Sequence, residues 1–267
     1  MQSFDNCETD GDADFYGIGI RLGLYAQSLT TLLVTLFVHE EEAVNRILNL
    51  LLQLAIFAGT LLSTNAGTIR AFEVIIVFWM LVGALSSLTG SGVTDINSFS
   101  GICRLLFYAA LSAYGCWFFF VGQDTMQDTP CTQIVFFGKS SLNGWFRTFG
   151  KAISIISISI TVGLLAWAGT TYIRQGNREK LQRISYRPQT DITLMLLSIA
   201  MIVLSITSTE YVIRANHLSG VDDIFDVGQV LAFLVGLFQL LNVLVPILFK
   251  QRLLAPRCWL LFGRHLT

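Results

Sequence analysis

The chain has 267 residues, of which 53% are hydrophobic and only 13% are charged, and its mean hydropathy is +0.63. Soluble proteins carry about 25% charged residues, so this composition excludes an ordinary soluble protein and predicts an all-α polytopic membrane protein. The formal net charge is -1 and the basic residues cluster in two places, which gives no reason to expect nucleic-acid binding.

The first apolar segment, residues 17–38, is long enough to cross a bilayer but contains a charged residue, Arg21. It has no basic leader and no small-residue cleavage site, so we expect a retained span and not a cleaved signal peptide. Small or polar residues recur here at helical steps of three or four, and this stripe is predicted to face protein: Asp14, Gly17, Arg21, Tyr25 and Ser28. Two roles for Arg21 stay open, a structural tether to a carboxylate on another span and a direct part in a functional site.

Further apolar segments follow, so the sequence predicts a seven-helix transmembrane bundle over residues 17–249. The second segment is amphipathic because Asn45, Asn49 and Gln53 recur at steps of four, and we expect this polar face to point into the bundle. The whole chain, 1–267, then forms a single transmembrane domain. The predicted spans are 17–38, 43–62, 72–88, 101–121, 152–172, 192–213 and 227–249.

Lysine and arginine are concentrated in two segments outside the predicted spans. Five lie between spans five and six and four lie in the C-terminal tail, residues 250–267, whereas the acidic N-terminal tail, residues 1–16, has none. The excess of basic residues on cytosolic loops predicts that both basic segments are cytosolic and that the N terminus lies outside the cytosol, in a lumen or the extracellular space. We expect a multi-pass protein of the endoplasmic reticulum.

The longest predicted loop, residues 122–149, is expected on the same outer side as the N terminus. Aromatic and basic residues interleave from Val135 to Phe149, which is typical of a stretch lying in the membrane interface. An ordinary interfacial anchor and a substrate gate are both compatible with this pattern. Cys131 in the loop and Cys7 in the N-terminal tail share that side, where a disulfide and two free thiols both stay open.

Carboxylates and one arginine fall at the outer ends of the predicted spans. Glu73 opens span three, Glu210 closes span six, Asp226 opens span seven, and Arg21 lies within span one. Ionising three carboxylates around one arginine in a low-dielectric setting is unfavourable, because their negative charges repel one another. We therefore expect at least one of them to stay protonated near neutrality. A buried neutral carboxylic acid is a proton donor, which makes these three acids the candidate catalytic residues. The alternative is a simple ion pair of Arg21 with Glu73 or Glu210 that fixes helix packing.

Residues 222–226, Asp-Asp-Ile-Phe-Asp, match the D-D-x-x-D pattern with which some prenyl-processing enzymes hold magnesium and a diphosphate. The pattern is short, it would face the outer side, and no second magnesium-binding motif occurs, so we expect neither a metal nor another cofactor. No H-E-x-x-H, no glycine-rich phosphate loop and no G-x-S-x-G occurs, and the three histidines lie far apart in the sequence.

The run from Asp12 to Gln27 reads D-x-D-x-x-G-I-G-I-R-x-x-x-Y-x-Q. It resembles a family of fungal seven-span proteins that are similar to the membrane-bound meroterpenoid cyclases of the ascofuranone and macrophorin pathways. The first span carries the resemblance, together with chain length, span count and residues 139–149. The resemblance implies a metal-independent terpene cyclase, of isomerase or lyase type, in fungal secondary metabolism. Such an enzyme cyclises a farnesyl-type chain on an aromatic or quinone-like ring after protonating an epoxide or a terminal olefin.

Protonation-initiated cyclisation needs an acid, a dry pocket that folds the chain, and aromatic faces that stabilise the migrating cation. Arg21, Tyr25 and Trp79 are the residues that we expect to bind substrate or to support the site. The expected partners are a lipophilic prenylated small molecule and membrane lipid. The alternative is a seven-helix receptor-like or other non-enzymatic membrane protein. Against familiar receptors, no D-R-Y follows span three, residues 242–246 do not read N-P-x-x-Y, and span seven has no lysine for retinal.

Overall fold

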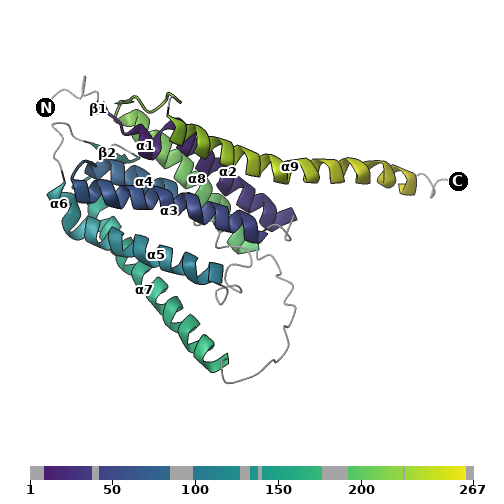
Figure 1. Ribbon diagram of the computed structural model, residues 1–267, viewed down its shortest axis with the longest axis horizontal. Coiled ribbons are helices and arrows are strands. Elements are labelled where there is room, and N and C mark those ends of the chain that lie inside the picture. Colours follow the sequence, from purple (N-terminus) through teal and green to yellow (C-terminus); the bar gives the residue numbers. More distant parts are fainter. Residues whose placement is uncertain are drawn as a thin grey trace.

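The computed structural model describes residues 9–37, 42–84, 99–126, 133–137, 140–175, 192–224 and 226–262. Helices make up most of the described chain and run alongside one another as a bundle, and α9 extends past the others toward the C terminus (Figure 1). Cys7, Cys131, Lys139 and the basic segment 176–191 lie outside the described residues, so the predictions that concern them stay predictions.

Two short sheets accompany the helices: β1 pairs with β4 in parallel, and β2 pairs with β3 in antiparallel register. The strands are β1 (Thr9–Asp10), β2 (Ile134–Phe136), β3 (Ser140–Ser141) and β4 (Leu218–Ser219). The helices are α1 (Ala13–Tyr16), α2 (Ile18–Phe37), α3 (Glu42–Ala66), α4 (Ala71–Ala84), α5 (Phe99–Trp117), α6 (Gln123–Thr125), α7 (Trp145–Gln175), α8 (Ile192–Ala215) and α9 (Val227–Phe262), with a π-helical turn, Phe118–Gly122, between α5 and α6.

Six helices of the described chain are long and apolar enough to cross a membrane, which confirms the prediction of a helical, multi-pass membrane protein. A seventh apolar helix, Ala71–Gly83, is shorter and coincides with predicted span three. The six are Ala13–Phe37, Val44–Ala66, Gly101–Thr125, Trp145–Thr170, Met195–Ala215 and Val227–Phe249.

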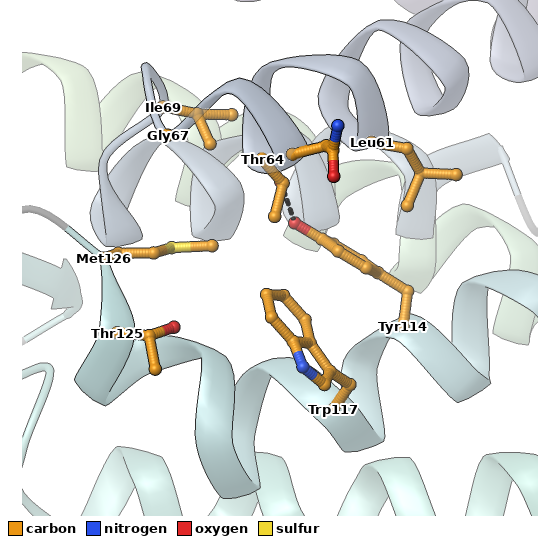
Figure 2. Close-up of a pocket in the computed structure, with 9 residues that line it drawn as sticks. Leu61, Thr64, Gly67, Ile69, Tyr114, Trp117, Thr125 and Met126 are labelled. Carbon is orange, nitrogen blue, oxygen red and sulfur yellow. Dashed lines mark hydrogen bonds between the residues drawn. The ribbon is translucent and has the colours of Figure 1, made fainter.

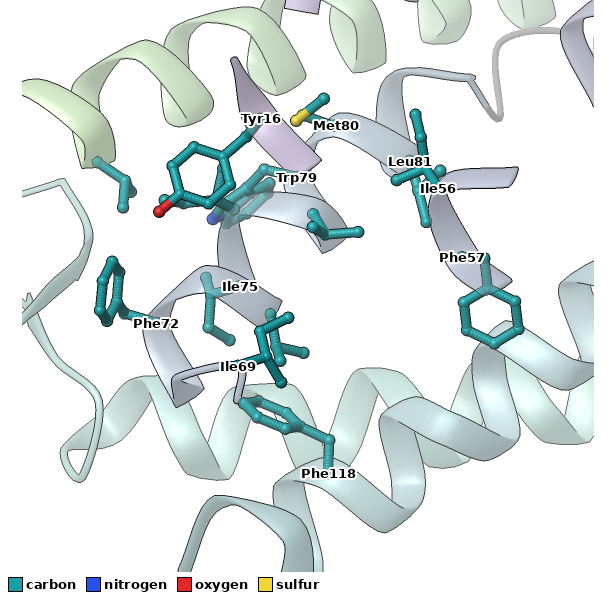
Figure 3. Packing of buried hydrophobic residues seen from close by; sticks show 14 of the residues in the cluster. Tyr16, Ile56, Phe57, Ile69, Phe72, Ile75, Trp79, Met80, Leu81 and Phe118 are labelled. Carbon is teal, nitrogen blue, oxygen red and sulfur yellow. The ribbon is translucent and has the colours of Figure 1, made fainter. Parts of the chain in front are cut away.

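Helix α4 lies at the centre of the apolar core. A helix that is apolar all round is stable only where protein or lipid surrounds it completely. Phe72 and Leu81 are 0% exposed and Ile75 is 1% exposed, and α4 packs against α8, α2 and α3 (Figure 3). Helix α4 is therefore surrounded by other helices, which accounts for apolar residues on all its faces.

Helices α2 and α9 pack with their backbones nearly in contact. A Cβ at Gly19 would lie 2.5 Å from the backbone oxygen of Gln229, and a Cβ at Gly236 would lie 2.8 Å from the Cα of Gly23. Backbones approach this closely only where side chains are absent, and small residues recur at membrane helix interfaces for that reason. The glycines on predicted span one therefore form a packing seam, which we call the α2–α9 seam.

The small-or-polar stripe that was predicted on span one faces protein over most of its length. Gly17, Arg21 and Ser28 are buried and Tyr25 is half-buried. Asp14 is the exception, because its side chain is exposed. The backbone of Gly17 is extended, with ψ at 155°, so it ends α1 and interrupts the helical spacing that the prediction carried back to Asp14.

The polar face that was predicted on span two points into the bundle. Asn45 is 9% exposed, and Asn49 and Gln53 are each 1% exposed. Gln53 donates a hydrogen bond to Asn49 over 2.8 Å, and Asn49 donates to the Thr31 hydroxyl of α2 over 3.4 Å. These bonds satisfy part of a polar face that would be costly in contact with lipid.

The predicted loop 122–149 is wrong at both ends. Gly122 still belongs to the π-helical turn, and α7 begins at Trp145 and not at residue 152. Arg147 explains the difference, because its guanidinium binds both carboxylate oxygens of Asp124 over 2.8 and 2.5 Å and its charge is satisfied within the helix pair. The aromatic residues from Trp145 to Phe149 therefore lie on the first turns of a long helix, and their position in the membrane interface stays a prediction.

Candidate functional site

The beginnings of α2, α4 and α9 and the ends of α3, α5 and α8 meet at one end of the bundle, which we call the N-terminal end (Figure 1). Strands β1 and β4 pair there, and β2 is bound to the end of α8 through two hydrogen bonds between Asn216 and the backbone of Ile134, of 2.8 and 2.6 Å. Arg21, Glu73, Glu210 and Asp226 all lie at this end, as the predicted span order requires.

Arg21 is the centre of a buried ionic cluster. Its side chain is 3% exposed, and one guanidinium nitrogen lies 2.8 Å from each carboxylate oxygen of Glu210. The other nitrogen donates to the carboxylate of Asp222 over 2.6 Å and to the carbonyl of Val221 over 3.2 Å. The Tyr25 hydroxyl also donates to Glu210, over 3.1 Å. The prediction that Arg21 pairs with Glu210 is confirmed, and Tyr25 supports this pair.

Glu73 lies in a second cluster without a salt bridge. The residue is 4% exposed, and its carboxyl group accepts a hydrogen bond of 2.8 Å from the Tyr16 hydroxyl and another of 2.8 Å from the backbone N–H of Arg70. Tyr16 in turn accepts a 2.9 Å bond from the backbone of Asp12. Among the described residues no cationic side chain forms a salt bridge with Glu73, so the predicted pairing of Glu73 with Arg21 is wrong.

The Asp12 carboxylate caps α1 by accepting a 3.0 Å hydrogen bond from the backbone of Asp14. Partial burial raises the pKa of the Asp12 carboxyl above its ordinary value, mainly because the charged form loses solvation. The cap holds the short helix α1 over Glu73, so Asp12 orders the Tyr16 hydroxyl that binds the acid.

Asp226 does not join Arg21 and the two glutamates. It is exposed, and its carboxylate accepts a 2.9 Å hydrogen bond from the backbone of Gly228 at the start of α9. Asp222 takes the place that was predicted for Asp226, because the chain after β4 brings it back onto Arg21. We expected Glu73, Glu210 and Asp226 to converge on Arg21, but of these three acids only Glu210 binds it.

Two acidic residues of the D-D-x-x-D run have separate partners and do not face one common site. Asp222 is bound to Arg21 while Asp226 caps α9, so two of its three acidic side chains already have protein partners. In the part of the chain that the structure describes, no three His, Cys, Asp or Glu side chains are grouped so that they could hold a metal ion.

Trp79 is a packing residue of α4. It is 9% exposed, its indole N–H donates to the carbonyl of Val135 over 3.3 Å, and its ring stacks on Phe136 with centroids 5.3 Å apart. Phe146 of α7 lies 6.3 Å from the same ring. Trp79 therefore fastens the β2–β3 hairpin to the core and takes no part in the Arg21 or Glu73 clusters.

A cavity of about 410 Å³ opens between the end of α3 and the end of α5 (Figure 2). Its volume falls in the range of small-molecule sites. Ile69 lines the cavity and is followed directly by Arg70, whose backbone binds Glu73, so only the α3–α4 turn separates the two features. The other principal lining residues are Leu61, Thr64, Tyr114, Trp117 and Met126.

Sequence reasoning missed Tyr16, the pairing of Asp222 with Arg21, and this cavity. Tyr16 stands four residues after Asp12, a spacing that indicates a hydrogen bond across one helical turn, and this was the only local signal for it. Asp222 and the cavity depend on contacts between segments about 200 and 50 residues apart, which no sequence motif reports. No protein-family model, no curated protein and no solved structure matches this chain.

Proposed function

We propose that this protein is a membrane-embedded terpene cyclase that acts on a prenylated aromatic or quinone-like intermediate, with Glu73 as its proton donor. The observation that carries the proposal is the setting of Glu73: a buried carboxyl group held by a tyrosine hydroxyl and a backbone N–H, with no salt bridge among the described residues. Burial without a salt bridge favours the neutral carboxylic acid, which is the form that can donate a proton.

The other two candidate acids are less suited to this role. Glu210 binds one guanidinium nitrogen of Arg21 through both oxygens, so this carboxylate already serves as an ion-pair partner between α8 and α2. Asp226 is exposed and caps α9, so it lacks the dry surroundings that protonation-initiated cyclisation needs. Among the three acids, Glu73 has the surroundings that best suit a protonated carboxyl group.

The proposed reaction begins when protonated Glu73 transfers its proton to the epoxide oxygen or the terminal olefin of the substrate. The carbocation that follows is attacked by the next double bond of the same chain, and the last cation loses a proton to a base, so the reaction is an isomerisation overall. Tyr16 covers Glu73 and is 0% exposed, so the substrate reaches the acid only after α1 moves aside. Its hydroxyl then returns to Glu73 and shields the carboxylate until it is protonated again.

Buried aromatic side chains support the cationic part of this chemistry. Phe78 lies within 5.8 to 6.1 Å of the rings of Tyr114, Phe118 and Phe119, measured between centroids. Phe57 lies 5.7 Å from both Phe107 and Tyr114. Aromatic faces attract a cation more strongly in a dry site than in water, so walls of this kind favour cyclisation over capture of the cation by water.

A substrate with a long prenyl chain dissolves in the bilayer and reaches such a site laterally, between helices. We further propose that the N-terminal end of the bundle faces the lumen of the endoplasmic reticulum, because nine lysine and arginine residues lie in the segment between spans five and six and in the C-terminal tail.

The test is product formation by microsomes that carry the protein and are incubated with a farnesyl-substituted phenol whose terminal double bond is epoxidised. Glu73→Gln keeps the shape of the side chain and removes its transferable proton, so turnover should fall by about 100-fold or more. Asp226→Asn is the matched control, because it also converts an acid to an amide at the same end of the bundle and should leave turnover within about twofold.

Equal protein levels and equal unfolding temperatures are required of all variants before turnover is compared. Normal turnover by Glu73→Gln would rule out Glu73 as the donor. Loss confined to Asp226→Asn, together with sensitivity to a chelator, would favour magnesium chemistry at residues 222–226. No product from the wild-type protein with either an epoxide or an olefin substrate would favour the receptor-like alternative.

A further inference from the structure

The cavity between α3 and α5 carries two sets of groups, aromatic on one side and polar on the other. Figure 2 shows the rings of Tyr114 and Trp117 on one wall, and Thr125 and Met126 opposite Tyr114 across the open space. Leu61 and Trp117 also line the cavity and are 41% and 40% exposed, so the cavity opens at the surface of two membrane helices. A lipid-soluble molecule can therefore enter it from the side.

Hydrogen bonding within the cavity leaves the Tyr114 oxygen, beside the aromatic wall, able to accept a hydrogen bond from a ligand. The Thr64 hydroxyl has a single proton, and it donates this proton to the carbonyl of Thr60 over 2.7 Å. The 2.7 Å bond between the Thr64 and Tyr114 hydroxyls is therefore donated by Tyr114. With its own proton committed to Thr64, the Tyr114 oxygen offers the cavity only a lone pair, which suits a ligand that carries a hydroxyl donor.

The aromatic wall is held in place by the π-helical turn that follows it. Trp117 stacks on Tyr114 with centroids 5.5 Å apart and an interplanar angle of 29°. A Cβ at Gly122, the last residue of the turn, would lie 2.7 Å from the indole ring, so the absence of a side chain there leaves the space that the ring occupies. Single π-helical turns occur often at functional sites. The partly exposed indole favours a planar ring as its stacking partner.

We infer that this cavity binds the ring of a lipid-soluble, hydroxylated aromatic molecule, with the ring on Trp117 and a ring hydroxyl donating to the Tyr114 oxygen. The inference goes beyond the cyclisation proposed above, because binding here requires neither Glu73 nor any reaction. The chemical class is that of a prenylated phenol or hydroquinone, in which the ring supplies stacking and the hydroxyl supplies the hydrogen bond.

The experiment measures equilibrium binding of farnesyl-hydroquinone to the purified full-length protein in lipid nanodiscs. Two reference probes separate the two contacts: farnesol, which has the chain without the ring, and the dimethyl ether of farnesyl-hydroquinone, which has the ring without a hydroxyl donor. Both should bind the wild-type protein at least about fivefold more weakly than farnesyl-hydroquinone, given the usual worth of one stacking contact or one hydrogen bond.

Variants of the cavity test the assignment of each contact. Leu61→Trp fills the cavity and should weaken binding of farnesyl-hydroquinone by about tenfold or more, whereas Leu62→Trp, at the next position of the same helix and 72% exposed, should leave it unchanged. Tyr114→Phe removes the acceptor, so it should weaken binding of farnesyl-hydroquinone by about fivefold and leave binding of the dimethyl ether unchanged. Trp117→Leu should weaken both ring-bearing probes.

Equal binding of farnesol and farnesyl-hydroquinone, or equal binding by Leu61→Trp and Leu62→Trp, would overturn the inference. An equal loss for both ring-bearing probes in Tyr114→Phe would overturn the hydrogen bond to Tyr114. Glu73→Gln should bind farnesyl-hydroquinone as the wild type does. A protein that binds the ring but forms no cyclised product therefore refutes the proposed function alone, and one that forms product without binding at this cavity refutes this inference alone.

Discussion

At the scale of the residue, the identity of the hydrogen-bond donor separates Glu73, which is buried, from Glu210, which is half-buried. Glu210 meets a guanidinium and Glu73 meets a phenol and a backbone N–H. A guanidinium brings a full charge that compensates the carboxylate, whereas the neutral donors bring only dipoles. The first arrangement ties α2 and α8 together, and the second is the one on which the proposed role of Glu73 as proton donor rests.

Arg21→Leu tests whether the ion pair between Arg21 and Glu210 stabilises the fold. The substitution leaves Glu210 partly buried without its cation, so we expect the free energy of unfolding to fall by about 3–5 kcal/mol. The measurement is the unfolding midpoint of the purified protein in detergent. Arg214→Leu removes an exposed arginine from the last turn of α8 and serves as the control, with an expected change within about 0.5 kcal/mol.

A second variant separates the ion pair from other effects at this position. Arg21→Leu combined with Glu210→Leu removes both charges, and it should be more stable than Arg21→Leu alone because no buried carboxylate is left unpaired. An unfolding midpoint for Arg21→Leu equal to that of the wild type would contradict the assigned role of the pair.

At the scale of the element, the α2–α9 seam shows that glycine can stabilise a membrane helix pair. Glycine in the interior of an isolated helix is unfavourable by about 1 kcal/mol relative to alanine, so helix propensity alone argues against Gly19 and Gly23. Contact between the two backbones offsets this cost through van der Waals packing that a side chain would prevent. A helix pair that meets over glycine is also closely fixed in register, because each glycine accommodates one part of the opposing backbone.

Gly23→Ala tests the seam. Its new Cβ would lie 2.8 Å from the carbonyl carbon of Ala232, which is backbone and has no rotamer by which to move away. We expect a loss of about 1–3 kcal/mol in the free energy of unfolding, as for overpacking elsewhere. The comparison is thermal unfolding of this variant with that of Gly163→Ala.

Gly163 is the matched control, since it is an exposed residue of α7 and a Cβ added there would meet no other atom within 4 Å. Helix propensity favours alanine at such a position, so Gly163→Ala should keep or slightly raise stability. If both variants were equally stable, close backbone contact would not be the reason for the glycine at position 23.

At the scale of the whole molecule, the proposed orientation in the membrane rests on charges and not on packing. The bundle packs identically whichever way it is inserted, whereas the basic residues of the connecting segments differ between the two sides. The clusters of Arg21 and Glu73 and the cavity all lie at the N-terminal end of the bundle. The side of the membrane on which that end lies therefore also fixes the compartment whose pH and solutes reach these groups.

Protease protection in sealed microsomes tests the orientation. An epitope tag placed before Met1 should survive protease added from the cytosolic side, because we expect the N-terminal tail to be lumenal. A tag placed after Thr267 should be digested under the same conditions, and both tags should be digested once detergent opens the vesicles. Digestion of the N-terminal tag in sealed vesicles would reverse the orientation.

The sequence by itself determined the class of the molecule, because hydropathy acts locally: runs of apolar residues predict where helices cross a membrane, whatever those helices pack against. It also determined that Arg21 needs a carboxylate and that the polar face of Asn49 and Gln53 points inward, since both follow from the cost of leaving polar groups in lipid. The beginning of α7 was misplaced because Arg147 looked like the end of an apolar run until its partner Asp124 was known.

Only the tertiary structure decided which acid meets which donor. Glu73 and Glu210 both adjoin apolar segments of the sequence, yet one meets Tyr16 of α1 and the other meets Arg21 of α2. Asp222 and Asp226 share one acidic run, and the return of the chain after β4 separates them into a partner of Arg21 and a helix cap. The cavity likewise exists because the ends of α3 and α5 meet at Thr64 and Tyr114. Hydrogen bonds and cavities are made between distant segments, so their specificity is a property of the packed bundle and is absent from any single helix.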